Sequence, residues 1–497
     1  MSVPAWLATA DRDSPWPALE VVVAGAGVSG AAAAEALLAL GARVTVVDER
    51  DDDAGRERAA RLEKRGARVR LGPDAASTLP AGAPGLVVTS PGWRPTAPLL
   101  VAALRSGIPV WGEVELAWRL RDTADPAPWL AITGTNGKTT AVRMLGEMLR
   151  CAGRRPAVAG NVGAPVVTAV LDAAHDVVAV ELSSFQLHWT HTLAAHSAAV
   201  LNVAPDHLDW HGSLDAYTAA KGRVYDRVAV ARVFNADDPV TERLARNALA
   251  AGGARAVGVT LGPPRPGMLG VLDDRLLDRA FPLPSGGPDA NKDDAVATEA
   301  PVELATVDDV RPAAPHNVAN ALAAAALARS VGIPAEAVRD GLRAFRPDRH
   351  RVEAVCSAGG VTYVDDSKAT NPHAALASLE AHASVVWVAG GLAKGAVFDD
   401  LVRAAAPRLR GVVLLGADRG LIAHALARHA PEIPVVEVRT ADNEAMDHVV
   451  DAAAGLAQPG DTVLLAPACA SQDMFPGYGA RGDAFAAAVR RHHGRSR

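Results

Sequence analysis

The sequence predicts an α/β protein of several domains, in which helices cover sheets of mostly parallel strands. Two observations predict this class: short apolar runs alternate with helix-like segments along the 497 residues, and two glycine-rich turns, at 25–30 and 134–140, each join a strand to a helix. A chain of this length is too long for one compact core. We therefore expect three domains, over residues 1–127, 128–345 and 346–497.

The first domain is expected to be Rossmann-like. Its apolar runs alternate with helical segments, as in a doubly wound parallel sheet. The expected strands lie at 21–27, 43–48, 67–71 and 85–90, and the first helix lies at 31–40. DTADPAP at 122–128, with its prolines and acids, is the expected linker to the next domain.

The central domain is expected to resemble a P-loop ATPase. WLAIT (129–133) reads as a strand that leads into the second glycine-rich turn, and a helix then runs to about Arg150. Further strands are expected at 177–182, 198–203 and 228–234, and a helix at 316–330. Residues 281–301 are rich in Pro, Gly and Asp and poor in large apolar side chains, which predicts a disordered surface insertion.

The last domain is again expected to be a Rossmann-like α/β domain. Strands expected at 384–391, 411–416 and 461–468 alternate with alanine-rich helical segments.

Composition limits the possible partners. The formal net charge of -6 does not favour a nucleic acid or an anionic membrane, and no apolar run of about 18 residues indicates a membrane span. Cys151, Cys356 and Cys469 form no CxxC pair, which fits a reducing cytosol, and the N-terminus lacks a signal-peptide pattern. These features predict a cytoplasmic protein. We expect a monomer, because no coiled-coil pattern or exposed apolar stripe is evident.

Lysine is rare in this chain. Only six of the 50 basic residues are Lys, and Lys138, Lys221, Lys368 and Lys394 lie in the motifs described below. Because Arg supplies positive charge almost everywhere else, these positions are expected to need a compact ammonium or a primary amine. Drift in a GC-rich genome, with lysines left at random, is the alternative.

The first glycine-rich turn, GAGVSG (25–30), opens a helix, and Asp48 ends the next strand. These are the ingredients of the dinucleotide fingerprint, in which glycines let the backbone approach a pyrophosphate at a helix N-terminus. Taken alone, the motif indicates a nucleotide diphosphate, of which NAD is the usual one, or a tight turn without a ligand.

The second turn, GTNGKTT (134–140), carries more specific chemistry. Its backbone N–H groups can face phosphates, Lys138 can meet the β/γ oxygens and the Thr139 hydroxyl can reach Mg²⁺. Ile132 stands six positions before Lys138, where a standard P-loop has Gly. Glu181 ends a later strand, which is a normal position for a carboxylate that holds Mg²⁺.

ITGTNGKTT resembles the phosphate-binding loop of the Mur ligase superfamily, which also includes folylpolyglutamate synthetases. Other segments resemble, in the expected order, the branch of that family that adds D-glutamate: GNVG (160–163), ELSSFQL (181–187), NVAPDHLDWH (202–211), AYTAAKGRVY (216–225), HNVANALAA (316–324), RHRVE (349–353), DDSKATNP (365–372), GGLAKG (390–395) and APACASQDMF (466–475). The resemblance covers the chain apart from its two tails and the 281–301 segment.

The resemblance implies a ligase of peptidoglycan precursor synthesis. Such an enzyme joins D-glutamate to UDP-N-acetylmuramoyl-L-alanine, with ATP converting the alanine carboxylate to an acyl phosphate that the amine then attacks. In this family the first turn binds the UDP-sugar rather than NAD.

The resemblance also assigns site residues by their positions in these motifs. ATP binding is implied for Gly134, Thr135, Asn136, Gly137, Lys138, Thr139, Thr140, Asn317, Asn320, Arg351 and Asp366. UDP-sugar binding is implied for Ser29, Asp48, Arg50, Ser90, Gly92, Asn161 and His207. D-glutamate binding is implied for Lys368, Thr370, Lys394, Ser471 and Tyr478, which stands where the family commonly has Phe.

By the same resemblance Lys138, His207 and Lys221 are catalytic, and two Mg²⁺ ions are bound. One ion would be held by Thr139 and Glu181, and the other by His207 and Lys221. Lys221 would carry a carbamate derived from CO₂, which requires a primary amine that Arg cannot supply.

Three other functions remain open at this point. A sister ligase could add a different amino acid or glutamylate a folate. An NAD-dependent oxidoreductase would explain GAGVSG and Asp48, but it would leave the second turn and the last domain without a role. A non-catalytic P-loop scaffold would bind ATP without releasing ADP in response to an amino acid.

Overall fold

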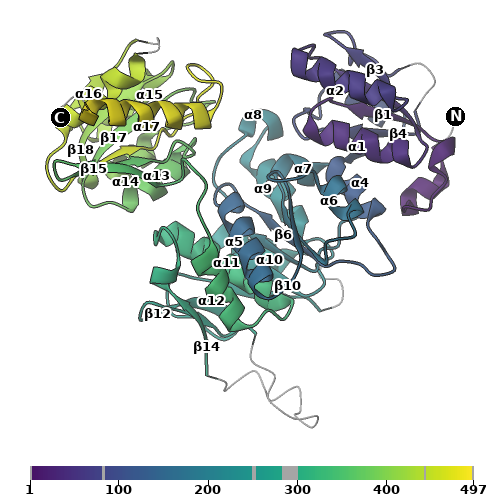
Figure 1. The fold of residues 1–497 in the computed structure, drawn as a ribbon, viewed down its shortest axis with the longest axis horizontal. Helices are drawn as coiled ribbons and strands as arrows, with labels where there is room; N and C mark the ends of the chain where they lie inside the picture. The colour runs from purple at the N-terminus through teal and green to yellow at the C-terminus, as the bar shows by residue number, and fades with distance from the viewer. Residues whose placement is uncertain (1–2, 81–83, 249–252, 282–299, 441–443, 495–497) are drawn as a thin grey trace. The chain divides into compact units, whose positions relative to one another are not determined.

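The computed structural model describes residues 3–80, 84–248, 253–281, 300–440 and 444–494, and three sheets lie within them (Figure 1). The chain divides into two compact units. Unit 1 comprises 1–203, 215–310 and 318–345, and unit 2 comprises 204–214, 311–317 and 346–497. The first two sheets belong to unit 1 and the third to unit 2, so the predicted α/β class is confirmed.

The first sheet is parallel and doubly wound. Its five strands, counted over the described residues, run in the order β3 (Arg68–Leu71), β2 (Arg43–Asp48), β1 (Glu20–Ala24), β4 (Leu86–Thr89) and β5 (Val110–Gly112). Its helices are α1 (Val28–Ala39), α2 (Asp53–Lys64), α3 (Pro98–Arg105) and α4 (Glu113–Leu120). The strand order reverses between β1 and β4, and open sheets of this kind bind ligands at such a point.

The second sheet is mixed. Nine strands, in the part of the chain that is described, run in the order β14 (Val302–Thr306), β13 (Arg275–Asp278), β12 (Met268–Leu272), β11 (Arg255–Val259), β10 (Ala231–Asn235), β9 (Ser197–Val200), β6 (Trp129–Thr133), β8 (Val177–Glu181) and β7 (Pro156–Gly160). Its helices are α5 (Lys138–Cys151), α6 (Val166–Leu171), α7 (Ser184–His188), α9 (Leu214–Gly222), α10 (Pro239–Asn247), α11 (Pro315–Ser330) and α12 (Ala335–Ala344).

Two features of the second sheet differ from the sequence-based expectation. The strand expected from residue 228 begins only at Ala231, and β11 to β14 extend the sheet, with antiparallel pairing from β12 onward. Their short runs carry Asp, Arg and Gly, which weaken the apolar strand pattern. Residues 282–299 of the expected insertion lie outside the described residues.

The third sheet brings three parallel strands together at its centre. The order over the described part of unit 2 is β15 (Glu353–Ala358), β16 (Val361–Asp365), β20 (Thr462–Leu465), β17 (Val385–Gly390), β18 (Leu409–Leu415) and β19 (Val435–Glu437). The helices of this unit include α8 (Leu208–His211), α13 (Pro372–Glu380), α14 (Asp399–Ala405), α15 (Arg419–His429), α16 (Ala445–Leu456) and α17 (Tyr478–Gly494). Since β16, β20 and β17 are parallel neighbours, their carboxyl ends meet at one edge.

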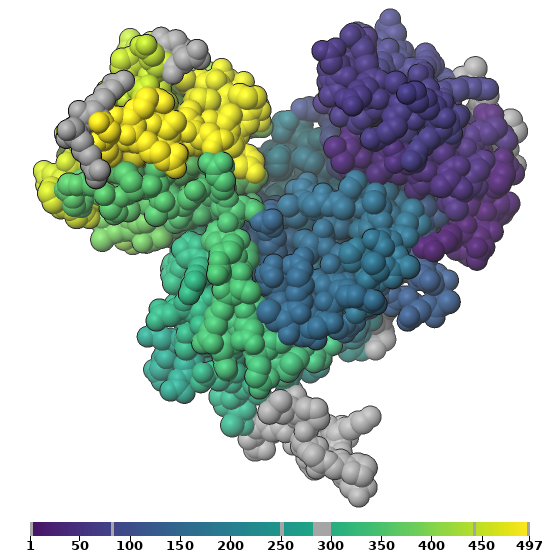
Figure 2. Space-filling view, viewed as in Figure 1, coloured from purple at the N-terminus to yellow at the C-terminus, as the bar shows by residue number. Residues whose placement is uncertain are grey.

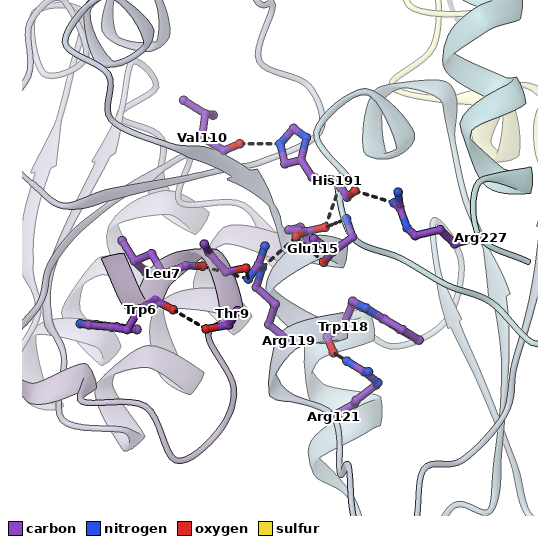
Figure 3. A network of polar contacts seen from close by, with 12 residues as sticks. Trp6, Leu7, Thr9, Val110, Glu115, Trp118, Arg119, Arg121, His191 and Arg227 are labelled. Carbon is purple, nitrogen blue, oxygen red and sulfur yellow. Dashed lines mark hydrogen bonds and ion pairs between the residues drawn. The ribbon is translucent and has the colours of Figure 1, made fainter. Parts of the chain in front are cut away.

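Helix α4 links the first sheet to the second within unit 1 (Figure 3). The buried Glu115 carboxylate accepts the N–H groups of His191 at 2.7 Å and Thr192 at 2.9 Å, and the Thr192 hydroxyl at 2.6 Å. Arg119 donates to Glu115 at 2.8 Å and to the Leu7 carbonyl oxygen at 2.9 Å. The first domain is therefore attached to the second through hydrogen bonds to a buried charge.

None of the helices in the described ranges is both long and apolar enough to cross a membrane.

Candidate active site

The central glycine-rich turn connects β6 to α5. Gly137 is left-handed (φ 83°), and a Cβ there would lie 2.3 Å from the Asn320 Oδ1 atom, so only glycine fits. Asn202, beyond β9, braces the turn: its carbonyl oxygen accepts the N–H of Thr135 at 3.0 Å and its Oδ1 accepts the N–H of Asn136 at 2.9 Å. The turn ends at a helix N-terminus, where backbone N–H groups favour an anion.

Lys138 is the first residue of α5 and folds back over this turn. Its ammonium donates to the carbonyl oxygens of Gly134 at 2.9 Å and Thr135 at 2.8 Å. Thr140 is buried in the same turn of helix. A compact cation therefore lies on the turn whose N–H groups could face phosphates.

Glu181 lies at the end of β8 and accepts hydrogen bonds from two polar side chains. Its carboxylate accepts the Thr139 hydroxyl at 2.8 Å and the Asn161 amide at 2.9 Å, and it is only 1% exposed. A carboxylate and a hydroxyl are hard oxygen ligands of the kind that Mg²⁺ prefers, whereas Asn161 presents its amide nitrogen to Glu181. Thr139 and Glu181 fit one Mg²⁺ ion beside the phosphate-binding turn.

Lys221 reaches the same turn from α9. It is 1% exposed, its ammonium donates to the Gly134 carbonyl oxygen at 2.7 Å, and it lies 4.5 Å from the centre of the Tyr217 ring. The Tyr217 hydroxyl in turn lies 3.0 Å from Thr135 Oγ1. The structure therefore brings Lys138, Lys221 and Thr135 together; Tyr217 was not identified from the sequence.

The first glycine-rich turn connects β1 to α1. Gly25 is left-handed (φ 107°), and a Cβ on Gly30 would lie 1.9 Å from the Gly25 carbonyl oxygen. The Ser90 hydroxyl, beyond β4, donates to the same carbonyl oxygen at 3.5 Å. Ser29 is half-buried in the first turn of α1, and Gly92 is exposed in the loop after β4. These residues surround the point where the strand order reverses.

Asp48 fixes the backbone of the first turn. Its carboxylate accepts the N–H of Ala26 at 2.7 Å and that of Arg50 at 2.9 Å, while the Arg50 guanidinium is exposed 3.6 Å away. Arg58 on α2 donates to the Ala26 carbonyl oxygen at 2.7 Å. Arg58 was missed because an arginine on an arginine-rich helix carries no distinguishing sequence signal.

Three loops follow neighbouring parallel strands of the third sheet: 366–371 after β16, 466–471 after β20 and 391–395 after β17. Backbone hydrogen bonds join them. Leu392 and Ala470 exchange two such bonds of 2.9 Å, and the Ala468 N–H donates to the Ala369 carbonyl oxygen at 2.9 Å. The loops therefore form one surface at the carboxyl edge of the sheet.

The residues expected to bind D-glutamate lie on these loops and at the start of α17. The Lys368 ammonium is 4.0 Å from the centre of the Tyr478 ring, and the Thr370 N–H donates to the Lys368 carbonyl oxygen at 2.8 Å. Lys394 is exposed with a left-handed backbone (φ 50°), and Ser471 is buried. Cations and hydroxyls suit a dicarboxylate.

The remaining expected site residues lie in unit 2. His207 is exposed, with a left-handed backbone (φ 53°) and its ring 3.7 Å from the Asp206 carboxylate. The Asn317 amide donates to the Pro312 carbonyl oxygen at 3.2 Å. Asp366 is buried, and burial raises its pKa to about 6 against the opposing charge of Arg351. Lys138, Glu181 and Lys221 belong to unit 1.

A second group of possible metal ligands lies beside loop 366–371. Ligand atoms of His350, Glu353 and Asp365 lie within 4.8 Å of one another. However, they already bond one another: His350 Nδ1 lies 2.7 Å from Asp365 Oδ2, and Glu353 accepts the His350 N–H at 2.8 Å. We interpret this group as a hydrogen-bonded cluster that stabilises the local fold rather than as a metal site.

Three family models match the chain, one for each sheet. The Mur ligase MurD-like N-terminal domain matches residues 19–112, the Mur ligase middle domain matches 132–260, and the Mur ligase glutamate ligase domain matches 350–469.

The chain belongs to the Mur ligase family. It is 60% identical to the UDP-N-acetylmuramoylalanine–D-glutamate ligase of Streptomyces avermitilis, over 96% of this chain and 98% of that protein. It is 59% identical to the ligase of the same name from Streptomyces coelicolor, over 95% and 97%. The solved structure of a pseudomurein peptide ligase type C from Methanothermus fervidus shares the fold, with a TM-score of 0.56 at 17% identity over 95% of this chain and 99% of that one.

The family uses ATP and Mg²⁺. The phosphate-binding turn and the Thr139–Glu181 pair of this chain fit both.

Proposed function

We propose that this protein is an ATP-dependent ligase that joins D-glutamate to UDP-N-acetylmuramoyl-L-alanine in peptidoglycan precursor synthesis. One observation carries the reaction class: the Thr139 hydroxyl bonds the buried Glu181 carboxylate beside a Gly-Lys-Thr turn. The substrate pair is supported by the 60% identity to a D-glutamate ligase over 96% of the chain.

The reaction forms an amide from two groups that do not react with each other at neutral pH. An oxygen of the L-alanine carboxylate attacks the γ-phosphorus of ATP, the bond to the β-phosphate oxygen breaks, and ADP leaves. The D-glutamate amine then attacks the acyl carbon, a tetrahedral intermediate forms, and inorganic phosphate leaves as the amine loses a proton. Catalysis of the first step depends on positioning and charge neutralisation more than on covalent chemistry.

The residues of unit 1 supply those two needs. The N–H groups of 134–140 hold the phosphates, and the Lys138 ammonium neutralises charge on the transferred group. Asn320 lies against the turn and would contact the adenine side of the nucleotide. From unit 2, Asn317, Arg351 and Asp366 would complete nucleotide binding.

Thr139 and Glu181 would hold one Mg²⁺ ion, which supplies charge neutralisation on the phosphates when bound. A second ion would be held by His207 and by Lys221 as its carbamate. The burial of Lys221 and its contact with the carbonyl oxygen of Gly134 support a role at the phosphates.

The two other substrates would bind at the remaining sites. Ser29, Asp48, Arg50, Ser90 and Gly92 of the first turn, with Asn161 and His207, would bind the UDP-sugar. Lys368, Thr370, Lys394, Ser471 and Tyr478 would bind D-glutamate, the lysines pairing with its two carboxylates. We further propose that the enzyme is cytoplasmic and monomeric. We also propose that each monomer consists of the three domains predicted from the sequence.

The deciding experiment is ADP release by the purified protein with ATP, Mg²⁺, UDP-N-acetylmuramoyl-L-alanine and one amino acid at a time. We expect release only with D-glutamate, together with a product of matching mass. Release with another amino acid would identify a sister ligase, and ATP binding without release would favour a scaffold.

The carbamate is tested by Lys221→Arg, which keeps a cation but cannot form a carbamate. We expect activity to fall at least about a hundredfold, since a ligand to the second ion is lost. Lys64→Arg, on the surface of α2, is the control. Full activity of Lys221→Arg would refute the carbamate.

A further inference from the structure

Arg481 is a fully buried arginine on α17, although that helix forms part of the surface of unit 2 (Figure 2). Its side chain is only 1% exposed and donates three hydrogen bonds. Nε donates to Ser367 Oγ at 2.9 Å, Nη2 to the Ser367 carbonyl oxygen at 2.8 Å and Nη1 to the Cys469 carbonyl oxygen at 3.1 Å. The guanidinium therefore bridges loops 366–371 and 466–471.

The two bridged residues stand beside residues proposed to bind D-glutamate. Ser367 directly precedes Lys368, and Cys469 lies two positions before Ser471. The Ser367 hydroxyl also donates to the carbonyl oxygen of Tyr478, at 2.7 Å. A shift of Arg481 would thus be transmitted to three of the proposed ligand-binding residues.

Buried charge without a close counter-ion is unusual. Within the described part of the chain, no carboxylate oxygen lies within 4.0 Å of the Arg481 nitrogens, and all three acceptors are uncharged oxygens. Burial lowers the pKa of the guanidinium to about 10, so it is still a cation at neutral pH. Asp473 and Asp365 oppose that lowering from outside ion-pair distance, and the charge that they leave uncompensated favours an anion on the adjoining loops.

We propose that Arg481 is a positioning residue for the amino-acid substrate: it fixes the two loops in register and places a buried positive charge beneath the site of the dicarboxylate. This inference rests on the proposed function, because it takes the loops as the D-glutamate site. Arg481 acts through Ser367 and Cys469 and needs no contact with the substrate.

Arginine is required here because of its shape. Three donors of one planar group reach acceptors on two loops, which a single ammonium cannot reproduce. Arg481→Lys keeps the charge and loses the fork, whereas Arg481→Met removes both. Comparison of these variants separates the effect of geometry from that of charge.

The chain offers a matched control in Arg232 on β10. It is also buried, and its guanidinium donates to the carbonyl oxygens of Ala245, Ala248 and Ala254, each at 2.8 Å. It differs in position, since it belongs to unit 1 whereas the proposed D-glutamate loops belong to unit 2. Arg232→Lys therefore measures how the loss of a buried guanidinium and its hydrogen bonds affects stability alone.

The experiment measures KM for D-glutamate, ATP and UDP-N-acetylmuramoyl-L-alanine, with kcat and the thermal midpoint, for the wild type and these variants. For Arg481→Lys we expect the KM for D-glutamate to rise at least about tenfold, with the KM for the other substrates within about twofold, since a charge-assisted bond between the loops is lost. Arg481→Met should raise it further. Arg232→Lys should lower the thermal midpoint and leave all three KM values unchanged.

Ser367→Ala provides a milder test should the Arg481 variants fold poorly. It removes one acceptor and leaves the two carbonyl bonds, so we expect the KM for D-glutamate to rise about threefold without a change in KM for ATP.

The possible failures are distinguishable. A wild-type protein without D-glutamate-dependent ADP release would refute the proposed function. An active wild type whose Arg481→Lys and Ser367→Ala variants keep the wild-type KM for D-glutamate, whatever their thermal midpoints, would overturn the positioning role.

Discussion

The two glycine-rich turns share a backbone design and differ in the side chains around them. Each follows a parallel strand, opens a helix and contains a left-handed glycine, Gly25 at φ 107° and Gly137 at φ 83°. In the first turn the Asp48 carboxylate accepts an N–H, whereas in the second the Lys138 ammonium lies over the loop. The backbone makes both turns suitable for phosphates, and the side chains decide whether a bound phosphate can also react.

The side chains around the two turns also differ in the chemistry that they can support. An acid at the next strand end and a glycine turn are compatible with any nucleotide diphosphate. Phosphoryl transfer needs in addition a compact cation and a metal-holding oxygen set, which only the second turn has, in Lys138, Thr139 and Glu181. We therefore expect changes at the second turn to affect chemistry and changes at the first to affect binding.

The largest effect is expected from Lys138→Ala. It leaves the second turn with backbone donors only, as in the first, so ATP should still bind while kcat falls at least about a thousandfold. Steady-state ADP release and equilibrium nucleotide binding measure the two quantities. The control Lys64→Ala, on the surface of α2, should have the wild-type kcat. A wild-type kcat for Lys138→Ala as well would contradict the proposal that the second turn, unlike the first, takes part in the chemical step.

Glu181→Gln should have the next largest effect. The amide keeps the shape and can still accept the Thr139 hydroxyl, but it removes the charge that attracts a cation. We expect kcat to fall about a hundredfold and the Mg²⁺ concentration for half-maximal activity to rise. A magnesium titration measures both, with Glu147→Gln on α5 as the control, and an unchanged midpoint would exclude Glu181 as a metal ligand.

Asp48→Ala tests the first turn. It removes the acceptor of two backbone N–H groups, so the turn loses its alignment. We expect the KM for UDP-N-acetylmuramoyl-L-alanine to rise about tenfold, and the KM for ATP and kcat to stay within about twofold. A comparable rise in KM for ATP would mean that the turns are not independent.

Much of this organisation is local enough to be predicted from sequence. The turns are short continuous segments whose glycines, Lys138 and Thr139 are adjacent in the chain, and the apolar strands before them follow their periodicity. Fold class and family were therefore predicted correctly. The antiparallel extension from β12 to β14 was missed because its short strands mix charged residues and glycine with apolar ones.

Contacts made by residues far apart in sequence were not predictable. Arg58 reaches Ala26 from the next helix, and Arg481 joins loops that are about a hundred residues apart, yet both are arginines in a chain rich in arginine. Tyr217 and Asn202 support the second turn through contacts that only the packed fold creates.

The smallest effect on activity, and a distinct effect on stability, is expected from Glu113→Gln. Glu113 begins α4, the helix that connects the domains of the two turns, and its carboxylate accepts the N–H of Val167 at 2.6 Å. Burial raises its pKa to about 7 from 4.5, against the opposing effect of the Val167 and Val166 N–H groups. Gln keeps the acceptor and removes the titration.

The sign of the pH dependence is determined by the raised pKa. Between pH 4.5 and about 7 the folded protein keeps the Glu113 proton that the unfolded chain has lost, so this group stabilises the fold at low pH and its contribution disappears as pH rises. The free energy of unfolding of Glu113→Gln minus that of the wild type should thus increase by about 2 kcal/mol from pH 5 to 7, rise by a few tenths more up to about pH 8 and level off above it. Urea unfolding at pH 5, 6, 7 and 8 measures this, with the exposed Glu63→Gln as control. A difference in the free energy of unfolding that does not change with pH would mean that Glu113 is ionised in the folded protein. The bond from α4 to Val167 would then be made by a charged carboxylate.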